Sequence, residues 1–314
     1  MSESSQQKVS RNRNTWLIPF ACLLAGGALT GISTNVAKYA GDIGLTPLGF
    51  LFWSIAGAAI ILLMVALIRK ECPSFNARSL EYYFVAALVS VAAANLLLFS
   101  AIPHVGASFV ALILSLPPLL TYLGALMLRM ERFNTVRALG VVAALIGAGV
   151  MAVHKFSAPD TSVFWILIAL CGPVLLAIGN IYRTLRWPDN ASISALAPGM
   201  LVAAAILLGL FSMMSDFSIA VSLENGLSTS LIAIQSCVFA GQFLLLFLLQ
   251  KTGGPVLLSL LGAVGAVFGV PIAIFLQGEH PPEGLLLGAS SIAIGVVLVT
   301  WGGVKMTVFK KEPR

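Results

Sequence analysis

The interpretation of the whole chain starts from residues 106–153, GASFVALILSLPPLLTYLGALMLRMERFNTVRALGVVAALIGAGVMAV. They form an apolar segment with a Pro-Pro pair in its middle, then a short charged turn, then a second apolar segment. The same plan returns at residues 254–300, GPVLLSLLGAVGAVFGVPIAIFLQGEHPPEGLLLGASSIAIGVVLVT. A shift of 148 residues superimposes Gly106 on Gly254, Glu131 on Glu279, Gly140 on Gly288 and Gly147 on Gly295. Four matches at one offset indicate a duplicated unit, which is typical of membrane proteins built from two related halves.

The composition places most of this chain in lipid. Of its 314 residues, 59% are hydrophobic and 10% are charged, and the mean hydropathy is +0.99. Soluble domains carry about 25% charged residues. The net charge of +6 does not indicate a nucleic-acid partner, because the basic residues sit in turns between apolar segments rather than in one run. The four cysteines are scattered and form no CxxC pair, so no metal site or cofactor is expected.

Ten apolar stretches follow a polar segment, residues 1–14, which we expect to be disordered and cytoplasmic. Each stretch is close to the roughly 20 residues that a helix needs to cross the hydrocarbon core of a bilayer. The predicted spans are residues 15–40, 45–68, 80–102, 106–128, 135–153, 162–182, 192–213, 228–250, 254–277 and 283–304. Residues 305–314 form a short tail after the last span. The sequence thus predicts an all-α integral membrane protein that crosses the bilayer ten times.

The distribution of Lys and Arg predicts the orientation. If the N-terminus is inside, only Lys38 and Lys155 of the 18 basic residues lie on the outer side, which is a strong positive-inside bias. Both termini are therefore expected in the cytoplasm. Because five spans is an odd number, residues 15–155 and 156–304 are predicted to be inverted repeats. At an offset of 145, Gly27 and Asn35 also fall on Gly172 and Asn180.

The chain resembles the drug/metabolite transporter superfamily, and more narrowly its ten-helix EamA-type permeases. The similar stretch runs from Leu116-Pro117 through Glu131-Arg132-Phe133-Asn134 to Gly140 and Gly147. The second copy departs from it, with Gly265 in place of Pro117. Within the superfamily the chain looks most like bacterial exporters of aromatic and other neutral amino acids. The resemblance implies a multi-pass protein of the bacterial cytoplasmic (inner) membrane that exports small metabolites by alternating access, with the lipid bilayer and a small-molecule substrate as its partners.

All twelve acidic residues fall in loops or at span ends, and no Lys or Arg was placed deep within a span. Because intramembrane ionisable groups are the usual proton relays, the sequence predicts a neutral or zwitterionic substrate and an uncoupled facilitator. A sugar nucleotide is anionic and would need basic residues deep inside the spans, where the sequence places none, so it is disfavoured. Drug efflux remains an alternative.

Uncharged polar residues inside the spans are the candidate substrate-binding residues. Asn35, Asn95, Asn180 and Gln242 lie on repeat-related spans, and a buried amide needs a partner or a water-filled cavity. Tyr122 and Trp53 lie far enough inside the spans to stack against a ligand. The alternative for each amide is interhelical hydrogen bonding. Glu131 and Glu279, in equivalent turns, are expected to cap helices or to pair with Arg132 or His280.

The sequence contains no HExxH, GxSxG or Walker motif, so no enzymatic activity is predicted. A non-transporting membrane subunit would not need inverted repeats, whereas alternating access uses them. A transporter is therefore favoured over both, and a ten-helix unit around one cavity is expected to function as a monomer.

Overall fold

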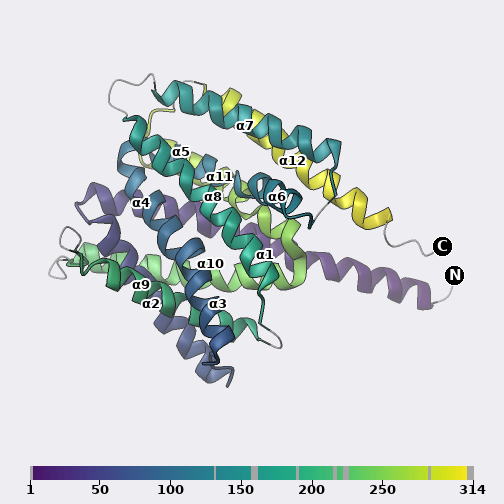
Figure 1. The fold of residues 1–314 in the computed structure, drawn as a ribbon, viewed down its shortest axis with the longest axis horizontal. Helices are drawn as coiled ribbons and strands as arrows, with labels where there is room; N and C mark the ends of the chain where they lie inside the picture. The colour runs from purple at the N-terminus through teal and green to yellow at the C-terminus, as the bar shows by residue number, and fades with distance from the viewer. Residues whose placement is uncertain are drawn as a thin grey trace.

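The computed structural model describes residues 3–130, 132–156, 162–188, 191–214, 218–221, 226–281 and 284–309. Within these residues every regular element is helical, as the composition predicted. In chain order (Figure 1) they are α1 (Glu3–Asp42), α2 (Pro47–Ile68), α3 (Ala77–Ala87), η1 (Leu88–Ala93), α4 (Ala94–Val105), α5 (Ala107–Ile113), α6 (Pro117–Met127), α7 (Thr135–Phe156), α8 (Val163–Leu185), α9 (Ile193–Phe211), α10 (Gly226–Ser259), α11 (Leu261–Pro271), η2 (Ile272–Leu276) and α12 (Leu285–Phe309). The segments η1 and η2 are π-helical.

Seven stretches in the described part of the chain are long and apolar enough to cross a membrane. They are Pro19–Asp42, Pro47–Ile68, Ala77–Val105, Ala107–Met127, Val163–Leu185, Ile193–Phe211 and Gly226–Lys251. Shorter apolar helices at Thr135–Val150, Leu261–Leu276 and Leu285–Leu298 occupy the three other predicted spans. Large apolar side chains such as Ile68, Phe275 and Leu286 remain exposed on the helix surfaces. The chain is therefore a multi-pass membrane protein whose outer surface suits lipid.

Two helices extend well beyond the boundaries expected from the sequence. Helix α1 begins at Glu3 and so runs through the segment that was expected to be a disordered tail. That segment contains neither glycine nor proline, so nothing in it ends a helix that continues into the first apolar stretch. Helix α10 continues to Ser259, past Gly253 and Gly254, where the sequence predicted the turn between the eighth and ninth spans. The turn between the third and fourth predicted spans is tight, since Gly106 alone lies between α4 and α5, at a φ of 87°.

Helix breaks interrupt two segments. The stretch Ala107–Met127 is interrupted between α5 and α6, where Pro117 takes the first position of α6. Helices α10 and α11 meet at Leu260 in a similar interruption. The two interruptions cross closely, because a side chain at Gly262 would overlap the carbonyl oxygen of Leu114. Discontinuous helices of this kind surround the substrate sites of many transporters.

Glycines allow the closest helix contacts. A Cβ atom at Gly147 would lie 2.6 Å from the carbonyl oxygen of Gly288, and one at Gly295 would lie 2.5 Å from that of Gly140. These contacts join α7 and α12, which run side by side along one edge of the molecule in Figure 1. The four glycines are the two pairs that the sequence offset relates.

The remaining helices form the main bundle. Helix α1 packs against α10 and α11, and helix α8 packs against α4 and α6. Helix α2 contacts α9 and α10, while α9 also contacts α3. At the α1–α11 contact a Cβ atom at Gly31 would lie 2.6 Å from the backbone of both Gly265 and Gly269. The start of α1 and the end of α12 lie at the same end of the molecule (Figure 1).

Candidate functional site

A cavity of about 100 Å³ lies between α1, α4, α8 and α10. This volume exceeds the space that one water molecule needs and is below the range of about 300–1,000 Å³ that is typical of sites for drug-sized ligands. The polar residues that line it are Thr30, Ser33, Thr34, Ser90, Asn95, Asn180, Arg183 and Gln242. The apolar ones are Leu98, Phe99, Leu114, Pro117, Leu176, Phe243, Leu246, Leu258, Leu261 and Gly262. Both halves of the chain contribute to the lining, as do both helix interruptions and the π-helical segment η1.

Three of the six predicted site residues meet at this cavity. The Asn95 side chain donates to the Val91 carbonyl oxygen one turn earlier, at 2.8 Å. The Gln242 amide donates to the Thr30 hydroxyl at 3.0 Å, and its own oxygen Oε1 is buried without a hydrogen-bond partner. The Asn180 oxygen accepts a hydrogen bond of 2.6 Å from Arg183. These amides are held in place by the helices and still leave hydrogen-bonding capacity at the cavity.

The other three predicted site residues lie elsewhere. Asn35 links α1 to α11, since its amide donates to the carbonyl oxygens of Gly31 and Gly269. Tyr122 lies on α6, and its hydroxyl accepts a hydrogen bond of 3.0 Å from the backbone amide of Asn134 in the turn before α7. Trp53 is 40% exposed and donates to the carbonyl oxygen of Ile219 in the loop before α10. The structure thus places these three in supporting contacts rather than in the cavity lining.

Arg183 lies within a helix, whereas the sequence predicted it in the loop after the sixth span. Helix α8 ends at Leu185, three residues later than predicted, so Arg183 belongs to its last turn. The side chain is only 1% exposed, and it lines the cavity. The end of the span was misplaced because boundaries are the least certain part of a sequence interpretation. One signal was present, since Arg183 stands at the offset of 145 from Lys38.

The cavity also contains an aromatic wall that the sequence did not single out. Phe99 and Phe243 both line it, and Phe239 lies behind them, with ring centroids 6.1 Å from each. Tyr82 is also buried and stacks on Tyr182. Periodicity could not find these rings, because spans that are apolar on all sides do not reveal which face is inward.

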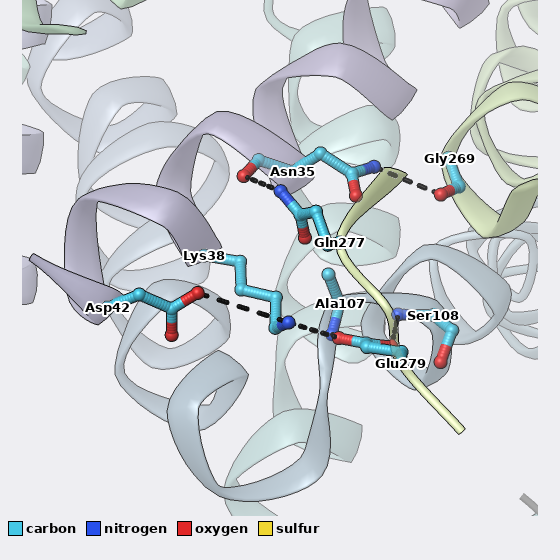
Figure 2. A network of polar contacts seen from close by, with 8 residues as sticks. All are labelled: Asn35, Lys38, Asp42, Ala107, Ser108, Gly269, Gln277 and Glu279. Carbon is cyan, nitrogen blue, oxygen red and sulfur yellow. Dashed lines mark hydrogen bonds and ion pairs between the residues drawn. The ribbon is translucent and has the colours of Figure 1, made fainter. Parts of the chain in front are cut away.

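A polar network closes the end of the bundle where α1 finishes (Figure 2). The Glu279 carboxylate accepts hydrogen bonds from the backbone amides of Ala107 at 2.6 Å and Ser108 at 3.0 Å. Glu279 therefore caps the first turn of α5, as expected of this residue. Its ion-pair partner is Lys38, 3.5 Å away, rather than His280. Glu131, its counterpart in the first half, lies outside the described residues.

The hydrogen bonds and the ion pair in this network favour the ionised form of Glu279. Burial raises the pKa of its carboxyl, but the hydrogen bonds from Ser108 and Ala107 and the charge of Lys38 outweigh burial. The pKa of Glu279 consequently lies below its usual value. Gln277 extends the network by donating to the carbonyl oxygen of Asn35 at 2.7 Å (Figure 2). Segments from both halves of the chain are thereby joined at this end.

Two comparisons with known proteins found similarity. The model of the EamA-like transporter family matches residues 17–153. A solved structure described only as a "Crystal structure of protein" superimposes with a TM-score of 0.60 at 18% sequence identity, over 94% of this chain and 99% of that one. At this identity the likeness concerns the fold alone. No curated protein matches the chain by sequence.

Proposed function

Because residues 17–153 match the model of the EamA-like transporter family, we propose that this protein exports small neutral or zwitterionic metabolites, above all neutral amino acids. The solute passes through the cavity between α1, α4, α8 and α10 by alternating access. The protein resides in the cytoplasmic membrane of a bacterium with both termini inside, and it works as a monomer. The strong positive-inside bias of the sequence supports this orientation.

An inverted five-plus-five repeat, with halves at residues 15–155 and 156–304, forms the scaffold of the transporter. The helix contacts support it, because the most extensive contacts between the halves either have a counterpart or join equivalent helices. The α1–α11 contact corresponds to α8–α6, α1–α10 to α8–α4, and α2–α10 to α9–α3. The pairs α7–α12 and α2–α9 each join equivalent helices. The reciprocal glycine contacts of Gly147 with Gly288 and of Gly295 with Gly140 follow the same rule.

The observation that carries the proposal is the polar cavity shared by both halves. Amides and hydroxyls around an open volume between membrane helices are typical of the path of a polar solute. None of the described residues that line it is Asp or Glu, which supports an uncoupled facilitator over a proton-driven pump. The volume suits small side chains in this conformation, and aromatic amino acids require the cavity to widen.

The test is transport by purified protein in liposomes. Uptake of radiolabelled alanine, valine, phenylalanine and tryptophan is measured with and without a pH gradient. Saturable uptake that is indifferent to the gradient supports the proposal, and Gln242→Leu should reduce it. Ser230→Ala is the matched control, because Ser230 lies on the same helix, is exposed and bonds only its own helix. Uptake that requires the gradient would refute the uncoupled mechanism, and a lack of amino-acid uptake would refute the substrate class.

A further inference from the structure

We propose that Arg183, held by Asn180, is the anchor for a carboxylate group of the transported solute. The inference rests on the proposed function and specifies its substrate class. Arg183 is almost completely buried, and its guanidinium stays charged because its pKa in water is far above neutrality. Among the residues that the structure describes, no carboxylate lies within ion-pair distance of it. A buried cation without a counter-ion is strongly unfavourable in a membrane unless a ligand or water supplies the missing partner.

The hydrogen bonds of Arg183 leave one of its donors unused. Its Nη2 atom donates to the Asn180 oxygen at 2.6 Å, whereas its Nε atom has no hydrogen-bond partner. The hydroxyl of Ser90, which lines the same cavity from η1, is also buried and unpartnered. A guanidinium presents its N–H groups in a planar fork that matches the two oxygens of a carboxylate. The site therefore has a cation, a fixed orientation and unused donors.

The first half of the chain shows how the equivalent residues behave when the protein itself supplies their hydrogen-bond and ion-pair partners. At the offset of 145, Asn35 corresponds to Asn180 and Lys38 to Arg183. Lys38 lies 3.5 Å from the Glu279 carboxylate, and Asn35 bonds backbone oxygens of α1 and α11. In the second half the amide and the cation face the cavity instead. The two halves have thus diverged at one pair of positions, and only the second pair is available to a solute.

The rest of the cavity indicates what the solute carries besides its carboxylate. Phe99 and Phe243 offer an apolar wall for a side chain. The unpartnered Oε1 atom of Gln242 is an acceptor for an ammonium group. Because a cation lines the cavity and no described carboxylate does, a cationic drug would be repelled. The chemical class that fits is a small amino acid with its carboxylate at Arg183.

The experiment compares an amino acid with its amide, which differ only in the carboxylate. Competition by valine and by valinamide for labelled valine uptake is measured in liposomes with wild-type protein, Arg183→Gln and Arg183→Lys. The wild type should prefer valine by about 10–100-fold, the range expected for a hydrogen-bonded charge pair. Arg183→Gln should abolish this preference, and Arg183→Lys should keep part of it because a point charge lacks the fork. Arg186→Gln, which removes an exposed charge three residues further on, should keep the wild-type ratio.

A binding measurement separates this inference from the transport function. Thermal stabilisation of the purified protein is measured with valine, valinamide and propionate. Stabilisation by valine and propionate that depends on Arg183, without any uptake, would support the carboxylate site and overturn the proposed transport. An acid-to-amide ratio in Arg183→Gln equal to that of the wild type would overturn the carboxylate site. So would a wild-type protein that transports solutes yet responds to neither carboxylate.

The competing explanation is that Arg183 pairs with Glu131, the sequence counterpart of Glu279. In that case Glu131→Gln should abolish the preference for valine over valinamide as completely as Arg183→Gln does. If Arg183 binds the solute, Glu131→Gln should leave the preference unchanged.

Discussion

Replacing Glu279 by Gln should loosen the end of the bundle where α1 finishes. The carboxylate accepts two backbone hydrogen bonds at the start of α5 and lies 3.5 Å from Lys38. An amide keeps one acceptor oxygen but loses the charge. Hydrogen bonds to charged groups contribute about 1.5–3 kcal/mol against about 0.5–1.5 for neutral ones. Losing one bond and weakening the other, with a discount for the exposed part of the site, gives a destabilisation of about 2 kcal/mol, or roughly 30-fold in an equilibrium constant.

The matched control is Asp42→Asn, which also removes a carboxylate near Lys38. Asp42 lies 4.0 Å from Lys38 and its side chain is 56% exposed, so the pair contributes about 0–1 kcal/mol before screening by solvent. Thermal unfolding in detergent should show a drop in Tm of about 4 °C for Glu279→Gln and little change for Asp42→Asn. Equal Tm values for the two variants would show that the Glu279 cap does not stabilise this end of the bundle.

Three further predictions concern acid sensitivity and packing. Because the folded-state pKa of Glu279 lies below its usual value, its contribution to stability is present above the unfolded-state pKa and is lost as the pH falls through the folded-state pKa. Acid titration of unfolding should therefore show a smaller loss of stability in Glu279→Gln than in the wild type, and identical curves would contradict this. Gly147→Ala should be less stable than Gly149→Ala by about 1–3 kcal/mol, because a side chain at Gly147 meets the backbone of Gly288 whereas one at Gly149 meets open space. Both changes carry the same gain in helix propensity, so equal unfolding temperatures would rule out a close α7–α12 contact. Tyr122→Phe should lower stability by about 1 kcal/mol by leaving the Asn134 amide without its acceptor, and an unchanged Tm would argue against that bond.

The sequence predicted the class of fold well and the cavity in part, for physical reasons that differ between residues. Long apolar runs require helices in lipid, so their positions were readable without knowing how they pack. Asn95, Asn180 and Gln242 were found because an amide in an apolar span needs a partner, and that argument holds whichever helix supplies it. Trp53 and Tyr122 were candidates only because they lie far from the ends of their predicted spans. The position along a span does not show which face of the helix turns toward the cavity.

Arg183 illustrates a different limit. Because helix α8 ends three residues later than predicted, Arg183 lies at a buried cavity rather than in a loop. A charge in a loop needs no explanation, whereas a buried charge does. The repeat offset carries that information, because Lys38 and Arg183 are related by the same shift as Asn35 and Asn180. Comparison within one chain could thus have identified the position, although only the structure shows that one cation has a carboxylate partner and the other faces a cavity.

The π-helical segment η1 affects how this region tolerates changes in length. A π-helical turn spans i to i+5 rather than i to i+4, so it accommodates one residue more than an α-helical turn. Deleting one residue from Leu88–Ala93 can therefore be absorbed by conversion to α-helix, which leaves α3 and α4 on the faces they now present. The same deletion within α2 would rotate every later residue of that helix by about 100°. Insertions and deletions among related chains should accordingly concentrate at this turn. There they would change the cavity lining near Ser90 without changing how the surrounding helices pack.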